Sequence, residues 1–124
     1  MKNTELAEAL FGAFAEGDAD TVRSLCTSDL QARQNDGPSM GLEPLLEFAL
    51  AVTRVVKDFR YEDAVRSPTE SGFVEEHNVC GVLPDGSDLN LTVCVVADVR
   101  DDKISNIREY FDSAAAAGLV SALS

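Results

Sequence analysis

The sequence predicts an α+β fold in which helices pack against an antiparallel sheet. Residues 73–112 form a pattern of three strands joined by two tight turns, and the residues before them alternate helical and strand patterns. The chain has 124 residues, of which 45% are hydrophobic, and this is enough to bury one core without disulfides. We therefore expect a single domain over residues 1–124, with no repeat or linker.

The elements outside these three strands follow from capping residues and apolar periodicity. The pattern predicts a first helix capped by Asn3 or Thr4 and ending at Gly17, and a short second helix starting at Asp18 or Asp20. A third helix begins near Pro44. Short strands are expected over residues 30–35 and 58–66, and a last helix over residues 114–123.

The first tight turn, Pro84-Asp85-Gly86-Ser87, sets the predicted register of the sheet. Asp-Gly supplies the two positive-φ residues of a two-residue hairpin loop, so Pro84 is expected opposite Ser87. Strand alternation then pairs residue 80 with 91, 78 with 93 and 76 with 95. This register places on one face Glu76, Asn78, Cys80, Leu91, Val93 and Val95, and it places His77 on the other.

The second turn extends the same face onto the third strand. A three-residue loop over residues 100–102 would place Val99 opposite Lys103. Counting back from that pair, Leu91 meets Phe111, Val93 meets Glu109 and Val95 meets Ile107. The face that carries Glu109 is therefore mostly apolar, and we expect it to point into the protein.

Three polar residues, Glu76, Asn78 and Glu109, interrupt this apolar face. A carboxyl group buried among apolar side chains loses hydration, which raises its pKa toward neutrality and suits it to proton transfer. We expect these three residues to form a polar site in an interior pocket. The alternative is that one sheet face is solvated, with these residues at its rim, or that the register slips by one residue.

Two flanking strands add candidate residues. Alternation sends Arg33 and Asn35 to one face of the first strand, where Arg33 would be a counter-charge for one of the acids. In the strand over residues 58–66, Tyr61 and Asp63 are expected to point inward. The single histidine, His77, has no partner at zinc-binding spacing and is expected on the outer face.

Composition limits the classes of partner. The formal net charge of −12 argues against nucleic acid and anionic membranes, both of which need a basic surface. Three cysteines without metal-ligand spacing favour reduced thiols and a cytoplasmic protein, and no export signal or membrane span is found. We expect no metal and no cofactor.

The order of elements, together with the Asp101-Asp102-Lys103-Ile104 and Arg108-Glu109-Tyr110-Phe111-Asp112 motifs, resembles the SnoaL-like proteins. These share the cone fold of nuclear transport factor 2, the ketosteroid isomerases and limonene epoxide hydrolase, and the resemblance covers nearly the whole chain. It implies a cone-shaped curved sheet wrapped around N-terminal helices, an interior apolar pocket, and a homodimer formed through the outer sheet face.

The resemblance also implies site positions. The arginine, the aspartate two residues after it and the second aspartate of limonene epoxide hydrolase match Glu76, Asn78 and Glu109 in that order, so that enzyme's catalytic set is not kept. Its water-holding tyrosine and asparagine look like Arg33 and Asn35. The ketosteroid isomerase tyrosine of the first helix is replaced by phenylalanine, at residue 11 or 14.

These observations favour an acid–base enzyme, of isomerase, cyclase or hydrolase type, that acts on a small apolar oxygenated molecule. The expected catalytic residues are Glu109, Asn78 and Glu76. The expected substrate-binding residues are Arg33, Asn35, Tyr61, Cys80, Leu91, Val93 and Phe111. The alternative is a non-catalytic ligand-binding or dimerisation module.

Overall fold

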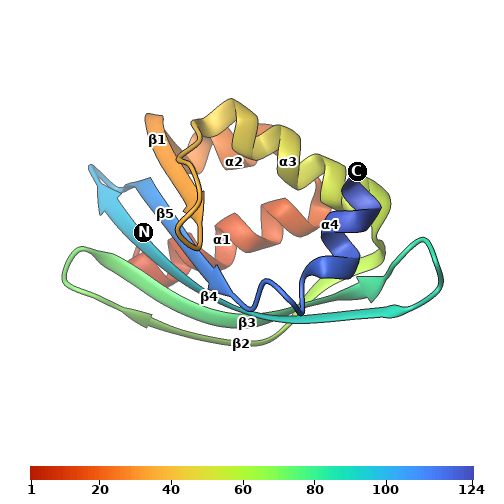
Figure 1. Ribbon diagram of the computed structural model, residues 1–124. Coiled ribbons are helices and arrows are strands. Elements are labelled where there is room, and N and C mark those ends of the chain that lie inside the picture. Colours follow the sequence, from red (N-terminus) through yellow and green to blue (C-terminus); the bar gives the residue numbers. More distant parts are fainter.

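Four helices lie on one side of a five-stranded sheet in the computed structural model, which describes residues 1–124 (Figure 1). The elements in chain order are α1 (Asn3–Glu16), α2 (Ala19–Leu25), β1 (Cys26–Gln34), α3 (Leu42–Val55), β2 (Lys57–Pro68), β3 (Gly72–Val82), β4 (Asp88–Arg100), β5 (Lys103–Phe111) and α4 (Ala117–Leu123). The predicted α+β class is confirmed. None of the helices has the length and apolar character needed to cross a membrane.

The sheet has the strand order β1-β5-β4-β3-β2 and curves around α1 (Figure 1). β1 runs parallel to β5, and the other three pairs are antiparallel. The concave face packs against α1, α3 and α4, and the core there includes Leu6, Leu10, Phe73, Ile104 and Ile107. The curved sheet around an N-terminal helix is the predicted cone.

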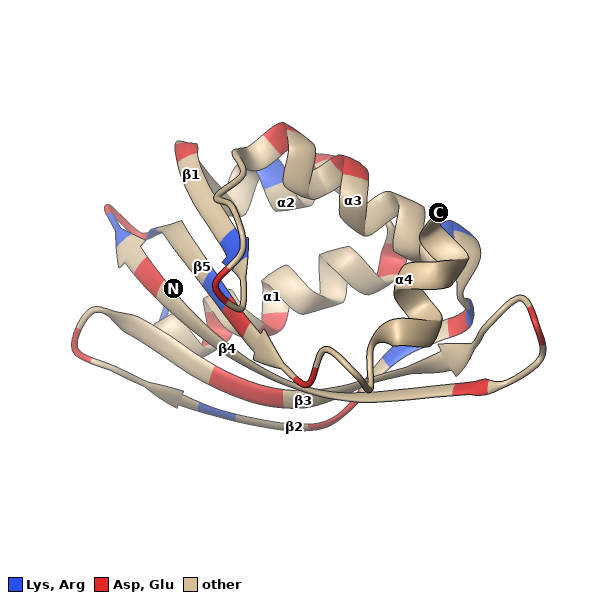
Figure 2. Cartoon of the chain, in the orientation of Figure 1, with Lys and Arg blue, Asp and Glu red and all other residues tan.

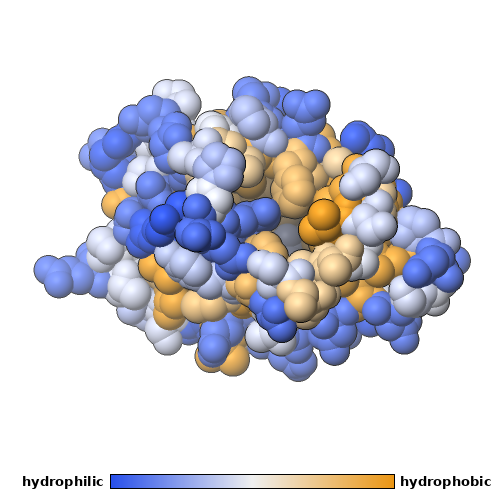
Figure 3. Space-filling model, viewed as in Figure 1, coloured by the Kyte–Doolittle hydropathy of each residue, from blue (hydrophilic) through white to orange (hydrophobic).

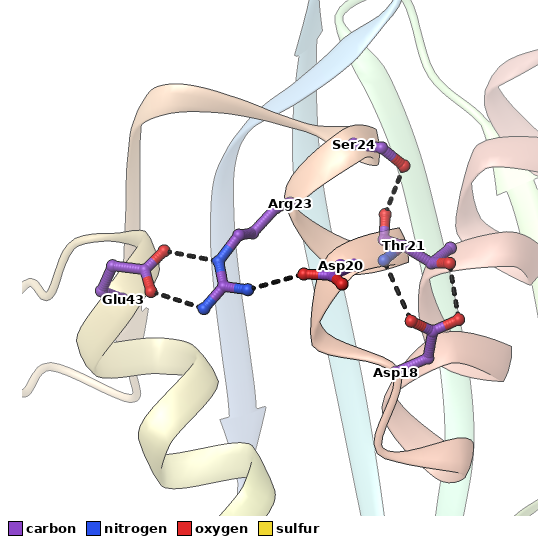
Figure 4. Close-up of polar contacts among 6 residues, drawn as sticks. All are labelled: Asp18, Asp20, Thr21, Arg23, Ser24 and Glu43. Atoms are coloured by element: carbon purple, nitrogen blue, oxygen red, sulfur yellow. Dashed lines mark hydrogen bonds and ion pairs between the residues drawn. The ribbon is translucent and has the colours of Figure 1, made fainter.

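The first two helices are joined at Gly17, as predicted. Its φ of 68° is left-handed, which glycine adopts without a steric cost. Asp18 then caps α2, accepting hydrogen bonds from the backbone and side chain of Thr21 at 3.1 and 2.6 Å (Figure 4). The cap of α1 was misassigned: Lys2 is the capping residue, and the Asn3 amide instead donates to the carbonyl of Gly72 at 3.0 Å.

An exposed ion-pair cluster connects α2 with α3. The Arg23 guanidinium donates two hydrogen bonds to Glu43, at 2.8 and 3.0 Å, and one to Asp20 at 3.0 Å (Figure 4). These side chains are solvated, so the cluster orients the two helices more than it stabilises the fold.

The predicted register of β3 is wrong by one residue because the first hairpin loop is longer than expected. The backbone N–H of Leu83 donates to Ser87 at 2.8 Å, and that of Gly86 donates to Leu83 at 2.9 Å. Pro84 and Asp85 occupy the centre of this turn, and Gly86 follows with a φ of 87°. This is the three-residue loop with a terminal glycine, which suits a proline in its first position.

The extra loop residue reverses the two faces of β3. His77 pairs with Val93, and Glu75 with Val95, on the interior face. Three residues expected inside, Glu76, Asn78 and Cys80, lie instead on the face away from the helices, since side chains alternate along a strand.

The second hairpin differs from the prediction in two ways, which together leave the predicted sheet faces unchanged. Its loop has two residues, Asp101 and Asp102, with φ of 53° and 62°, so Arg100 pairs with Lys103. An irregularity next to Asp98 then adds one residue to β5, and Glu109 pairs with Val95 rather than Val93. A total shift of two residues keeps the same face, so Glu109 points inward as predicted.

A bulge in β2 changes which of its side chains face the interior. Asp63 has a φ of 56°, and the register shifts between Glu62 and Val65. Tyr61 points inward as predicted, but Asp63 lies on the outer face and accepts a hydrogen bond from the Asn78 amide at 3.2 Å. After the bulge Arg66 pairs with Glu75, and Val65 is left 62% exposed.

Alanine substitutions at two glycines should change the stability of the protein in opposite directions. A Cβ on Gly72 would overlap the Ala97 carbonyl of the neighbouring strand, whereas a Cβ on Gly12 in α1 would meet nothing. We expect Gly72→Ala to destabilise the protein by about 2 kcal/mol through forced strand displacement. Gly12→Ala should stabilise it by about 0.5–1 kcal/mol. Urea unfolding of both variants measures the difference, and equal effects would contradict the strand spacing.

Candidate functional site

A cavity lies between the concave face of the sheet and the helices α1, α3 and α4. Its volume is about 90 Å³, which is room for several waters or one small molecule. Figure 3 shows a hollow bordered by hydrophobic side chains in this region. The lining residues are Phe11, Phe14, Gln34, Leu45, Phe48, Ala49, Val52, Thr53, Phe59, Tyr61, His77, Val79, Leu91, Val93, Glu109, Phe111 and Leu119.

A chain of charge-assisted hydrogen bonds reaches the cavity from the side of β2. The Arg66 Nε–H donates to Glu75 Oε1 at 2.7 Å, and Glu75 Oε2 lies 2.6 Å from Nδ1 of His77. Glu75 is fully buried, and His77 is 3% exposed. A buried carboxylate is costly unless it is paired, and here it has a cation on one side and an imidazole on the other.

This arrangement fixes the orientation and tautomer of His77. An ionised carboxylate only accepts hydrogen bonds, so Nδ1 of His77 carries a proton and donates it to Glu75. The other ring nitrogen, Nε2, has no hydrogen-bond partner. Thr27 Oγ1 is the one fully buried side-chain nitrogen or oxygen atom without such a partner, so Nε2 keeps some exposed surface. Since His77 lines the cavity, Nε2 is the nitrogen available to a bound molecule.

Glu109 and Tyr61 present two more polar groups to the cavity, beside the uncharged Gln34 and Thr53. Burial raises the pKa of Glu109, and the neighbouring His77 and a hydrogen bond with Gln34 oppose this in part. Burial also raises the pKa of the Tyr61 phenol, and the carboxylates of Glu109 and Glu75 add to the effect. Glu109 therefore holds its proton more tightly than an exposed glutamate, and Tyr61 stays a neutral hydrogen-bond donor.

Aromatic rings fix the position of the imidazole. The ring of His77 lies 4.7 Å from that of Phe11 and 4.6 Å from that of Tyr61, measured between centroids. Phe59 packs edge-on against Tyr61 at 5.1 Å. Tilted and edge-on pairs at these distances are favourable, and they hold the rings around the polar groups without adding further charge.

Five residues predicted for the site lie on the cavity wall. They are Glu109, Tyr61, Leu91, Val93 and Phe111. Their faces were predicted correctly because the shift in β5 is even and the bulge in β2 comes after Tyr61. Whether they bind a substrate stays a prediction.

The other five predicted site residues lie away from the cavity, so the prediction that they join Glu109 in one pocket is wrong. Glu76 is exposed, Asn78 bonds Asp63 and Thr92, and the Cys80 thiol donates to Glu62 at 3.2 Å on the outer face. Arg33 and Asn35 are separated from the pocket because β1 presents Gln34 to it.

Arg33 in β1 and Asn35 just after it have structural contacts instead. Arg33 donates to the Tyr110 hydroxyl at 2.9 Å, outside the cone, and no acid pairs with it. Asn35 accepts from the backbone of Phe111 at 3.1 Å and donates to Ser113 at 3.2 Å, which joins the end of β1 to the end of β5.

Sequence reasoning missed Arg66, Glu75 and His77. The signal that could have found them is the alternation Phe73-Glu75-His77-Val79, in which two ionisable residues interrupt an otherwise apolar face. With a three-residue loop at Gly86 this face points inward, so loop length alone separates the two readings.

Glu109 gives a prediction on the pH dependence of stability. A carboxyl group whose pKa is raised by folding stabilises the protein below its ordinary pKa, and this contribution is lost as pH rises through the folded-state pKa. Glu109→Gln cannot ionise, so we expect its melting temperature to exceed the wild-type value by a few degrees at pH 8 but not at pH 4. Glu76→Gln, an exposed glutamate with the same charge change, should show no such difference. An equal rise in melting temperature in both variants would show that the change in net charge, and not the burial of Glu109, causes the effect.

The curved sheet, the helices on its concave face and the apolar cavity between them define the chain as a cone-fold α+β protein. Residues 7–118 match the SnoaL-like domain family, so the chain belongs to this family. The predicted resemblance is confirmed. Among curated proteins, a sequence search finds no match.

Solved structures with the same fold span nearly the whole chain. A proposed polyketide cyclase from Xanthomonas campestris superposes with a TM-score of 0.81 at 22% identity, covering 98% of this chain and 96% of that one. An LEH-like epoxide hydrolase from M. tuberculosis gives 0.73 at 20% identity, covering 96% and 92%. A ketosteroid isomerase-like protein from Catenulispora acidiphila, in complex with trimethylamine, gives 0.78 at 14% identity, covering 92% and 91%. These similarities establish the nuclear transport factor 2-like cone fold.

Proposed function

We propose that this SnoaL-like protein is an acid–base enzyme, of the isomerase, cyclase or hydrolase type, acting on a small apolar oxygenated molecule. One observation carries the proposal: a buried imidazole, held by a buried carboxylate at 2.6 Å, presents its free nitrogen to an apolar cavity. The fold relatives support small-molecule chemistry in a cone of this kind.

His77 is the proposed base. Its Nε2 takes a proton from a carbon next to a carbonyl group, and the electron pair of that C–H bond moves to the carbonyl oxygen as an enolate forms. Glu75 accepts the Nδ1 hydrogen bond and stabilises the imidazolium, and the hydrogen bond from Arg66 holds Glu75 in position. A buried dyad of this kind loses little energy to reorganisation when the charge develops.

Tyr61 and Glu109 are the proposed donors to the developing oxyanion. A neutral phenol and a protonated carboxyl group both donate hydrogen bonds, and in an apolar cavity such bonds stabilise an anion more than they do in water. The imidazolium then returns its proton to a different carbon, which gives isomerisation, or the enolate carbon attacks a second carbonyl, which gives cyclisation. Activity should fall as pH rises through the pKa of Glu109, because the ionised form cannot donate.

The proposal is tested without knowing the natural product. Small cyclic ketones, such as cyclohexanone and 2-indanone, are incubated with the protein in D₂O, and proton NMR follows loss of the signal next to the carbonyl. We expect exchange faster than in buffer alone, saturating with ketone concentration. If no ketone exchanges faster although one raises the melting temperature of the protein, the chain is a binding module instead.

We further propose a homodimer formed through the outer sheet face. No helix covers this face (Figure 1), and it carries Val65, 62% exposed, and Tyr110, 40% exposed. Light scattering at micromolar concentration should give twice the chain mass of 13.3 kDa, and a monomeric mass would exclude the dimer. The free cysteines, two of them buried, support the proposed cytoplasmic location.

A further inference from the structure

The cavity is unusually rich in aromatic side chains. The chain contains six phenylalanines and two tyrosines, and six of these eight residues line this single cavity. They are Phe11, Phe14, Phe48, Phe59, Tyr61 and Phe111. The faces of aromatic rings carry partial negative charge, so a wall of them attracts a cation that has lost its water.

The charges that face this aromatic wall are of one sign. Glu109 is the only carboxyl group on the lining, and no lysine or arginine lies there. The guanidinium of Arg66 is bonded to the carboxylate of Glu75, which in turn contacts His77, so its charge is paired. Loss of hydration raises the pKa of Glu109, and His77 is the one neighbouring group whose charge opposes this.

The surrounding protein also favours cations. Its formal net charge is −12, and Figure 2 shows acidic positions on helices, strands and hairpin turns around the whole chain. A field of this sign raises the local concentration of small cations and lowers that of small anions. The cavity, its one carboxyl group and the surface thus select the same charge.

We propose that the cavity binds small alkylammonium cations, with Glu109 as the counter-ion and the aromatic side chains as the contact surface. This depends on the cavity lining and not on the proposed reaction, in which Glu109 acts in its protonated form. The two roles use opposite protonation states of one residue. Cation binding should therefore strengthen with rising pH, over the range in which turnover weakens.

The groups that face Glu109 support this pH dependence. β2 contributes Tyr61, which stays neutral, β3 contributes His77, and β1 contributes the uncharged Gln34. The lining residues of α1, α3 and α4 contain no titratable side chain.

Choline and 3,3-dimethyl-1-butanol form a matched pair of probes for this site. They have the same shape, choline carries a fixed positive charge at every pH, and the alcohol is its neutral carbon isostere. Calorimetric titration of the wild type should show choline binding at least tenfold more tightly than the alcohol at pH 8. Below the pKa of Glu109, choline affinity should fall by up to about tenfold per pH unit.

Glu109→Gln should remove the preference for choline and most of its pH dependence, while the alcohol binds as before. Glu76→Gln has the same charge change on the outer face and should leave choline binding unchanged. Equal affinities for choline and the alcohol, or choline binding that survives Glu109→Gln, would overturn the proposal. Ketone exchange is measured separately, so its failure alone rejects the proposed enzyme and not this site.

Discussion

His77→Gln should lower the rate of ketone proton exchange by about 100- to 10,000-fold, the range typical for loss of a positioned general base. Glutamine has a similar length and can still donate to Glu75, but it offers no basic nitrogen to the cavity. The cost should therefore fall on the chemical step. NMR exchange rates measured over a range of ketone concentrations separate kcat from KM, and we expect a change in kcat with little change in KM.

The control for this experiment lies on the opposite face of the same strand. Asn78→Ala, one residue away and on the outer face, should leave the exchange rate near the wild-type value. A far-ultraviolet spectrum and melting curve of His77→Gln establish that the variant is folded. A folded His77→Gln with wild-type exchange would exclude His77 as the base and leave Glu109 as the remaining candidate.

The sequence was sufficient for the fold because its strongest signals are local and redundant. Gly17, Asp18 and the apolar periodicity of residues 73–112 each specify one element without reference to the others. Glu109 was also found on the correct face, although its predicted partner was wrong. The Asp101-Asp102 loop and the irregularity next to Asp98 each shift the register by one residue. The total shift of two residues leaves Glu109 on the predicted face.

The site was only half predictable because strand faces depend on single-residue insertions. One additional residue in the Gly86 loop exchanged Glu76 and Asn78 for Glu75 and His77. The bulge at Asp63 likewise turned Arg66 inward and left Val65 exposed. Asp-Gly is compatible with both loop lengths, and an aspartate with positive φ is not distinguishable in sequence from an ordinary strand residue.

The bulge at Asp63 predicts a large effect at Arg66, since it is the bulge that brings this arginine to Glu75. Arg66→Ala should destabilise the protein by about 3 kcal/mol, because it leaves a fully buried carboxylate without its cation. That is a large share of the stability of a domain of this size, and urea unfolding measures it directly. Arg66 also lies 4.0 Å from Glu8, but that carboxylate is exposed, so losing this contact adds little to the cost.

Arg60→Ala is the matched control for this prediction. Arg60 lies on the same strand and bonds Glu62 at 3.0 Å, but both side chains are about half exposed, so its loss should scarcely change stability. A second comparison isolates the charge on Glu75. In a Glu75→Gln background, Arg66→Ala should cost much less than in the wild type, because no buried anion remains to be stranded. If Arg66→Ala costs the same in both backgrounds, Arg66 and Glu75 have no interaction energy. Arg66 would then stabilise the sheet by packing alone.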